Sequence, residues 1–266
     1  MSSSPVSVER NGAVATVWLD RPEKRNALDA ATMRALAEAL DAVRDDTSAR
    51  VLVLRGRGPM FSSGIDHGLL LEVFQKSRSA PFPHLHGDLQ AVFDRLERMH
   101  RPTVAVLHRA CMGMALELAL ACDLRLATAD CVLGLPEIAF GILPDVGGTT
   151  RLTRTVGPAR ARDLILTGKA VRAPLAERWG LVHEVATDEA DLARRLDRLL
   201  ARLTAHPLAA LGHAKQLIAA SADADTATSL RLEGIFQEVL LANPELPARF
   251  PDAVAFLKKE MADPDA

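Results

Sequence analysis

One apolar segment, interrupted by a single carboxylate, constrains this chain more than any other feature. It runs from Met112 to Asp123 as MGMALELALACD, so that Leu, Met, Ala and Cys surround Glu117. The pattern predicts a helix in the protein core, where an unpaired charge costs several kcal/mol. An ion pair with an arginine such as Arg125 would compensate that cost. The alternative is catalysis, because acid/base chemistry uses buried carboxylates whose pKa has moved toward neutrality.

Two further carboxylates follow in apolar and glycine-rich surroundings. Glu137 lies in GLPEI and Asp145 in GILPDVGGT. Glu137 together with Glu117 favours an acid/base pair over a structural carboxylate. Asp145 has a simpler interpretation, because Pro-Asp-x-Gly is an ordinary turn in which Asp bonds its own backbone. We therefore expect Glu117 and Glu137 to be catalytic, prefer a turn role for Asp145, and keep it as a third catalytic candidate.

The apolar pattern outside this segment predicts an α/β fold. Val51–Leu54 and Thr103–Leu107 are short, wholly apolar runs that suit buried strands. Asn11-Gly12 between two strand-like segments predicts a β-hairpin. Asp29 suits the N-cap of a helix over residues 30–43. This strand–helix–strand order is typical of an α/β fold with partly parallel pairing.

The pattern becomes helical near residue 191. Further helices are expected over residues 191–203, 207–219, 226–241 and 247–261. We therefore predict an α/β core over residues 1–190 and a helical region over residues 191–266, with the boundary between residues 187 and 206.

Two segments between the strands have distinct compositions. Residues 56–67 are glycine-rich and contain FSSGID, a composition that lets backbone N–H groups approach a ligand closely. Residues 68–87 lack clear periodicity, and we interpret them as a mobile or variable lid. The histidines in and beside this lid, including His86, are expected to be solvated loop side chains.

The composition excludes several classes of function. Lys plus Arg (32) nearly balances Asp plus Glu (34), so no basic face for nucleic acid is expected. The longest apolar run is far shorter than the roughly 20 residues of a membrane span. Three cysteines in apolar segments predict reduced, buried thiols, and no residue spacing indicates a metal site. Without a signal-peptide pattern, we expect a soluble cytoplasmic protein.

Taken together, short motifs along the chain resemble the enoyl-CoA hydratase/isomerase (crotonase) family. Each is weak alone, but they occur in the family's order over nearly the whole chain. They are LDRP with NAL, FSSGID, the segment from Gly113 to Arg125, Pro136-Glu137, the segment from Gly141 to Arg151, LTG, GLV and AFLKK.

The resemblance implies a crotonase-like spiral of ββα units and a C-terminal helical region used in trimer assembly, as a homotrimer or hexamer. It implies an acyl-CoA thioester substrate and no separate cofactor, because coenzyme A is part of the substrate. The backbone N–H groups of Ile65 and Met114 fall where the family forms an oxyanion hole, in which one donor is typically worth roughly 2.7–4 kcal/mol. Glu117 and Glu137 fall where hydratases keep their two catalytic glutamates.

The resemblance also implies residues that contact the substrate or its CoA moiety. Lys24, Ala27 and Leu28 belong to the segment that meets adenine and pantetheine. Phe256 and Lys259 resemble C-terminal residues that approach the nucleotide, often from a neighbouring subunit. The full set is Lys24, Ala27, Leu28, Ser63, Gly64, Asp66, Gly113, Phe256 and Lys259.

The chain departs from the family pattern in ways that leave the reaction open. His108-Arg109 stands where many hydratases have Asn-Gly, and the glycine cluster before Glu117 is thinned, with Met114 narrowing the room beside the thioester. Our leading hypothesis is an enoyl-CoA hydratase. The alternative is an enoyl-CoA or 3,5-dienoyl-CoA isomerase that uses Glu137 and Asp145. A lesser alternative is a non-catalytic acyl-CoA-binding scaffold.

Overall fold

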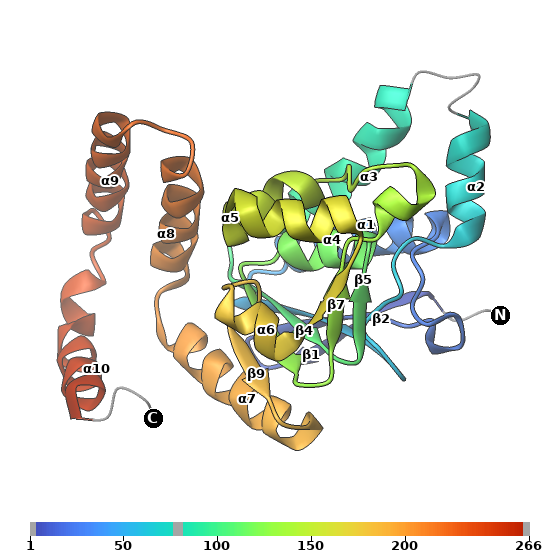
Figure 1. Cartoon of the computed structure of the whole chain (residues 1–266). Helices are drawn as coiled ribbons and strands as arrows, with labels where there is room; N and C mark the ends of the chain where they lie inside the picture. The colour runs from blue at the N-terminus through green and yellow to red at the C-terminus, as the bar shows by residue number, and fades with distance from the viewer. Residues whose placement is uncertain (1–3, 77–81, 263–266) are drawn as a thin grey trace. The chain divides into compact units, whose positions relative to one another are not determined.

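The structure is a computed structural model that describes residues 4–76 and 82–262 (Figure 1). The chain divides into two compact units, residues 1–208 and 209–266, which are described separately. The first unit contains both β-sheets and all the candidate site residues from Lys24 to Asp145. The second unit contains Phe256 and Lys259.

The larger sheet has six strands in the order β1-β2-β3-β4-β6-β9. β1 and β2 pair antiparallel with Asn11 opposite Val14, which confirms the predicted hairpin, and the other pairs are parallel. The strands are β1 (Val6–Asn11), β2 (Val14–Leu19), β3 (Val51–Gly56), β4 (Thr103–Leu107), β6 (Leu124–Thr128) and β9 (Glu184–Ala186).

A second sheet consists of three short strands, two of which come just before Glu117 and Glu137 along the chain. It consists of β5 (Ala110–Met112), β7 (Val132–Gly134) and β8 (Ala170–Arg172), in the order β5-β7-β8. β5 pairs parallel with β7, and β7 pairs antiparallel with β8. β5 leads directly into the helix that carries Glu117, so this small sheet fixes where that helix begins.

The helices of the first unit surround the larger sheet. They are η1 (Pro22–Lys24), α1 (Ala30–Asp45), α2 (His67–Lys76), α3 (Phe82–Glu97), α4 (Met114–Leu120), η2 (Glu137–Phe140), α5 (Gly148–Thr167), α6 (Ala173–Arg178) and α7 (Glu189–Ala205). Asp29 caps α1 as predicted, because its side chain accepts a hydrogen bond from the Thr32 N–H at 2.7 Å.

Both faces of the central strands β3 and β4 are buried, which explains their runs of apolar residues. Leu52 and Leu54 of β3 pack in one cluster with residues of α1 and α4. Val51 and Val53 point to the other face and pack with Leu192 of α7. Figure 1 shows α7 on the opposite side of this sheet from α1 and α4. The alternation along a wholly apolar strand therefore separates two cores rather than a core and a solvent face.

The segment interpreted as a mobile or variable lid, residues 68–87, is helical in its described part, and its role as a lid stays a prediction. Residues 67–76 form α2, and α3 begins at Phe82, so helix replaces the expected loop. Residues 77–81 of the expected lid lie outside the described residues. Asp66 explains the start of α2, since its carboxylate accepts a hydrogen bond from the Gly68 N–H at 2.8 Å.

The second unit is helical throughout its described residues. α9 (Thr226–Leu241) matches the predicted range, whereas the last predicted helix divides into η3 (Leu246–Arg249) and α10 (Phe250–Ala262). α8 (Leu208–Ser221) begins at the boundary between the units. In the described part of the chain, no helix combines the length and the apolar character that crossing a membrane requires.

Candidate active site

Glu117 lies one turn inside the buried helix α4. Its N–H donates to the carbonyl of Gly113 at 3.1 Å, and the residue is only 2% exposed. Gly113 precedes the helix with φ 55° and ψ −131°, a backbone conformation that favours glycine. β5, Gly113 and α4 therefore deliver a carboxylate from the core to a fixed position.

The structural interpretation of Glu117 as a partner of Arg125 is wrong. The Arg125 guanidinium instead donates to three backbone carbonyls, those of Leu181, Cys122 and Ala119, at 2.7, 2.8 and 3.3 Å. Because this buried guanidinium donates its hydrogen bonds to backbone carbonyl oxygens, it does not neutralise Glu117.

The partner of Glu117 is a backbone N–H at a helix start. Oε2 of Glu117 accepts a hydrogen bond from Gly148, the first residue of α5, at 2.6 Å. The positive end of a helix stabilises an anion at this position. A Cβ at residue 148 would lie 2.6 Å from both Oε2 and Cγ of Glu117, so only glycine allows this approach. The sequence analysis missed Gly148, although the paired glycines before Thr149 were a visible signal.

Glu137 is the first residue of η2, and the structure leaves one of its oxygens without a partner. Its Oε2 is buried and has no hydrogen bond to any described residue. A Cβ at Gly113 would lie 2.9 Å from Oε1 of Glu137. Glu137 therefore lies against the N-terminus of the helix that carries Glu117, which brings the two predicted carboxylates together.

Burial raises the pKa of both carboxyl groups, and a neighbouring carboxylate adds to each rise. The pKa of Glu117 rises to about 8, first because burial disfavours the charged form and then because Glu137 is close; the Gly148 N–H opposes the rise. The pKa of Glu137 rises to about 7, mainly through burial and then through Asp145. Near neutral pH the pair therefore retains at least one proton, so that one carboxyl can donate a proton while the other accepts one.

Asp145 combines a turn position with a place beside the two glutamates. Burial raises the pKa of its carboxyl, while His86 and its own backbone lower it. Its charge raises the pKa of both Glu117 and Glu137. The Nε2 atom of His86 lies 2.5 Å from the carbonyl oxygen of Asp145. His86 is therefore half-buried and bonded, which corrects the expectation that it is a solvated loop histidine.

The two backbone N–H groups assigned to the oxyanion hole lie close together. A Cβ at Gly64 would lie 2.4 Å from the Met112 carbonyl oxygen and 3.5 Å from the nitrogen of Met114. Gly64 has φ +94°, and Ile65 follows it. Within the described ranges, neither the Ile65 N–H nor the Met114 N–H donates a hydrogen bond. The loop and the start of α4 thus present two available donors side by side.

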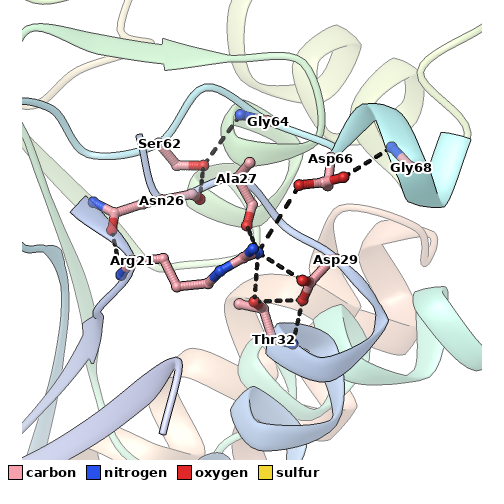
Figure 2. Close-up of polar contacts among 9 residues, drawn as sticks. All are labelled: Arg21, Asn26, Ala27, Asp29, Thr32, Ser62, Gly64, Asp66 and Gly68. Carbon is pink, nitrogen blue, oxygen red and sulfur yellow. Dashed lines mark hydrogen bonds and ion pairs between the residues drawn. The ribbon is translucent and has the colours of Figure 1, made fainter. Parts of the chain in front are cut away.

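Hydrogen bonds from two buried side chains hold the Ile65 loop in place. The Ser62 hydroxyl donates to the carbonyl of Asn26 at 2.8 Å and accepts from the Gly64 N–H at 3.1 Å. The Asn26 amide donates to the carbonyls of Arg57, Met60 and Phe61 at 2.8–3.1 Å. Figure 2 shows how Ser62 joins the Asn26 and Gly64 backbones.

Arg21 connects the Ile65 loop to the start of helix α1. Its guanidinium forms an ion pair with Asp29 at 2.7 Å, lies 4.0 Å from Asp66, and donates to the carbonyl of Ala27 at 3.0 Å (Figure 2). The structure therefore gives Asp66 and Ala27 structural contacts. Of the other predicted CoA contacts in this region, Lys24 and Ser63 are exposed and Leu28 is buried. Their contact with CoA stays a prediction.

A cavity of about 340 Å³ is lined by Ile65 and Met114, the two residues that carry these N–H donors. Ile65, Met114, His86 and Asp145 contribute to its lining, and the rest is apolar. The apolar side chains come from α2, α3 and the segment before α5: Leu70, Val73, Phe74, Leu89, Ile142, Leu143 and Val146. An apolar cavity with a few convergent polar groups is typical of a small-molecule site.

Two predicted site residues lie outside this unit, and the described residues offer no metal site. Phe256 and Lys259 are both on α10. No group of three or more His, Cys, Asp or Glu side chains in the described ranges is arranged to hold a metal ion.

Comparison with known proteins assigns the family. A sequence profile described as enoyl-CoA hydratase/isomerase matches residues 9–245. The chain belongs to this family. It is 34% identical over 260 residues to the 2,3-dehydroadipyl-CoA hydratase of Escherichia coli, an alignment that covers 98% of each chain.

Solved structures show that the fold is the crotonase α/β fold, with two sheets and C-terminal helices. The crystal structure of enoyl-CoA hydratase from Thermoplasma volcanium has a TM-score of 0.85 at 31% identity, covering 93% of this chain and 96% of that one. A Thermobifida fusca protein assigned as an enoyl-CoA hydratase, in complex with acetoacetyl-CoA, has a TM-score of 0.82 at 31% identity, covering 90% and 95%. The expected family and fold class are therefore confirmed.

Proposed function

We propose that the protein is an enoyl-CoA hydratase that adds water syn across the double bond of a 2-enoyl-CoA thioester. The observation that carries the proposal is the pair Glu117 and Glu137, two carboxyl groups at one place with pKa values raised to about 8 and about 7. Hydration needs one group that takes a proton from water and another that supplies a proton to carbon, and such a pair provides both near neutral pH.

In the proposed mechanism the thioester carbonyl oxygen accepts hydrogen bonds from the N–H groups of Ile65 and Met114. The form of the pair that reacts carries its shared proton on Glu137 and its charge on Glu117. In that form Glu117 removes a proton from water as the water oxygen bonds to Cβ, and the electron pair of the double bond moves toward the thioester as an enolate. The two donors stabilise the negative charge on that oxygen. Glu137 gives a proton to Cα, and transfer of a proton from Glu117 to Glu137 restores the starting state.

The identity of the substrate as a CoA thioester is supported by the relatives. One solved relative is in complex with acetoacetyl-CoA, and the Escherichia coli relative is a dehydroadipyl-CoA hydratase. For this chain we propose that Lys24, Ala27, Leu28 and Ser63 lie along the CoA moiety. We further propose that residues 191–266 form the assembly region of a homotrimer or hexamer, in which Phe256 and Lys259 approach the nucleotide.

Isomerisation of an enoyl- or dienoyl-CoA is the second candidate, and Asp145 favours it. This carboxyl lines the cavity, and its charge raises the pKa of Glu137. The two carboxyl groups could therefore move a proton between carbons of one substrate. Asp145→Asn separates the candidates: a hydratase keeps most of its activity, whereas an isomerase loses it. A non-catalytic scaffold has less support, because binding alone does not require two buried carboxyl groups whose pKa values are raised, and burying them costs stability.

Product analysis tests the proposal. Purified protein is incubated with a 2-enoyl-CoA and, separately, with 3-enoyl- and 3,5-dienoyl-CoA. The products are separated, and their masses are determined by mass spectrometry. Hydration adds the mass of one water, whereas isomerisation leaves the mass unchanged. Conversion of only the 3-enoyl or dienoyl substrates, without gain of water, would replace the hydratase proposal with the isomerase.

A further inference from the structure

Helices α2 and α3 separate two cavities rather than enclose one. The first is the cavity of about 340 Å³ that begins at Ile65 and Met114. A second cavity of about 390 Å³ lies between α1, α2 and α3. Val73 of α2 and Leu89 of α3 line both cavities. The wall between the two cavities therefore includes two apolar side chains, which change rotamer far faster than a helix moves.

The floor of the second cavity is apolar. Met33 of α1 and Val92 of α3 are 3% and 5% exposed, and Ala30, Ala37 and Leu69 add to this lining. An apolar lining of this extent beside a proposed substrate cavity favours an apolar occupant.

The mouth of the second cavity carries balanced charge. Its exposed residues are two arginines, Arg34 and Arg95, and two acids, Glu72 and Asp88. Arg95 also pairs with Asp41 at 3.4 Å. Because the two signs cancel, the mouth has no net attraction for a terminal carboxylate. The occupant that fits is an uncharged hydrocarbon chain.

We propose that the two cavities act as one acyl-binding channel, in which a long, neutral acyl chain passes between Val73 and Leu89 and ends in the second cavity. This inference rests on the proposed function and names its substrate class, long-chain 2-enoyl-CoA. The first cavity lies near the lower end of the roughly 300–1,000 Å³ range of ligand pockets and holds a short chain without the second.

Filling the second cavity from α1 tests the channel. Ala37 lines only the second cavity, so Ala37→Trp fills it without touching the first. Glu38→Trp is the matched control, because Glu38 is the next residue of the same helix, is exposed and lines neither cavity. We expect Ala37→Trp to lower kcat/KM for 2-dodecenoyl- and 2-hexadecenoyl-CoA at least about tenfold, the scale of discrimination in an apolar pocket, and to leave crotonyl-CoA within about twofold. Glu38→Trp leaves both values unchanged.

A second variant and a binding measurement keep the test decisive. Leu69→Trp fills the same cavity from α2 and should give the same chain-length profile. Binding of saturated dodecanoyl-CoA and butyryl-CoA, measured by calorimetry, requires no turnover. If no enoyl-CoA is hydrated but both Trp variants weaken only dodecanoyl-CoA binding, the channel stands and the hydratase proposal fails. If hydration is observed and folded Trp variants treat short and long chains alike, or if wild type rejects long chains, the channel is overturned.

Discussion

The Glu117 carboxylate and the Gly148 N–H meet at 2.6 Å, at the point where α5 begins. This contact joins two helices through the proposed base. Arg151, one turn further along α5, forms ion pairs with Asp94 and Glu97 of α3 at 3.2 and 2.6 Å. The segment that positions Glu117 is thus also attached to a helix that lines both cavities.

Gly148→Ala should disturb that position. The added Cβ would lie 2.6 Å from Glu117 Oε2 and must push the carboxylate away. Misplacement of a catalytic group by about 1 Å can cost roughly 100-fold in rate, and we expect a loss of kcat on that scale. Gly234→Ala on α9 is the control, since nothing lies within 4 Å of its added Cβ. Steady-state kinetics on crotonyl-CoA measures both variants, and full activity of folded Gly148→Ala would contradict the positioning role.

Glu117→Gln should change how stability depends on pH. The pKa of Glu117 is raised in the folded protein from 4.5 to about 8, so between these values the folded state binds more protons than the unfolded state. Stability therefore falls as pH rises through this window. Glutamine removes this loss, and at pH 8 the variant should be more stable by up to roughly 4 kcal/mol. Urea unfolding at pH 5 and pH 8 measures the free energy of unfolding of both proteins. An equal change in this free energy between the two pH values for wild type and variant would count against the raised pKa.

Asn26→Ala should destabilise the Ile65 loop. The Asn26 side chain is 1% exposed and bonds three carbonyls as donor and the Arg21 N–H as acceptor. Each group left unpaired costs up to about 3 kcal/mol. We expect the free energy of unfolding to fall by at least about 3 kcal/mol overall. Asn26→Asp should be worse than Ala, because it brings a negative charge to the three carbonyls. Thermal unfolding measures both variants, and a loss under about 1 kcal/mol for Ala would show that the network is dispensable.

Arg109→Gly should stabilise the protein. Arg109 has φ +59°, a left-handed conformation that costs a residue with a side chain on the order of 1–2 kcal/mol. Its exposed ion pair with Asp130 at 3.0 Å returns about 0–1 kcal/mol. We expect a net gain of about 1 kcal/mol for glycine. Arg109→Ala removes only the ion pair and should be neutral or slightly destabilised; equal stability of the two variants would rule out backbone strain.

The sequence predicted those parts of the fold whose pattern is local. The apolar runs at Val51 and Thr103 became buried strands, and the range of α9 matched at its start because Asp225 caps it. The strands β5, β8 and β9 have three residues each, too few to show a period. Helix α2 depends on capping by Asp66, which was assigned to substrate contact instead.

The candidate site was predictable only where chemistry is visible in one residue. Glu117 and Glu137 stand out as carboxylates among apolar residues, and the family resemblance gave them roles. Gly148 and His86 could not be assigned, because each acts on a residue distant in the chain, Glu117 and Asp145 respectively. The paired glycines before Thr149 signal a close approach, but the partner in each of these contacts is set by the packing of α3 and α5 and leaves no local pattern.

The central claim is that Glu117 and Glu137 together hydrate an enoyl-CoA. The most direct test follows the loss of conjugated enoyl-thioester absorbance with crotonyl-CoA for wild type, Glu117→Gln and Glu137→Gln. Both substitutions keep size and remove the ionisable carboxyl. The account predicts rapid loss of absorbance with wild type and a decrease in kcat of at least about 100-fold in each folded variant, the scale of a lost general acid or base. Near wild-type turnover in either variant would contradict it.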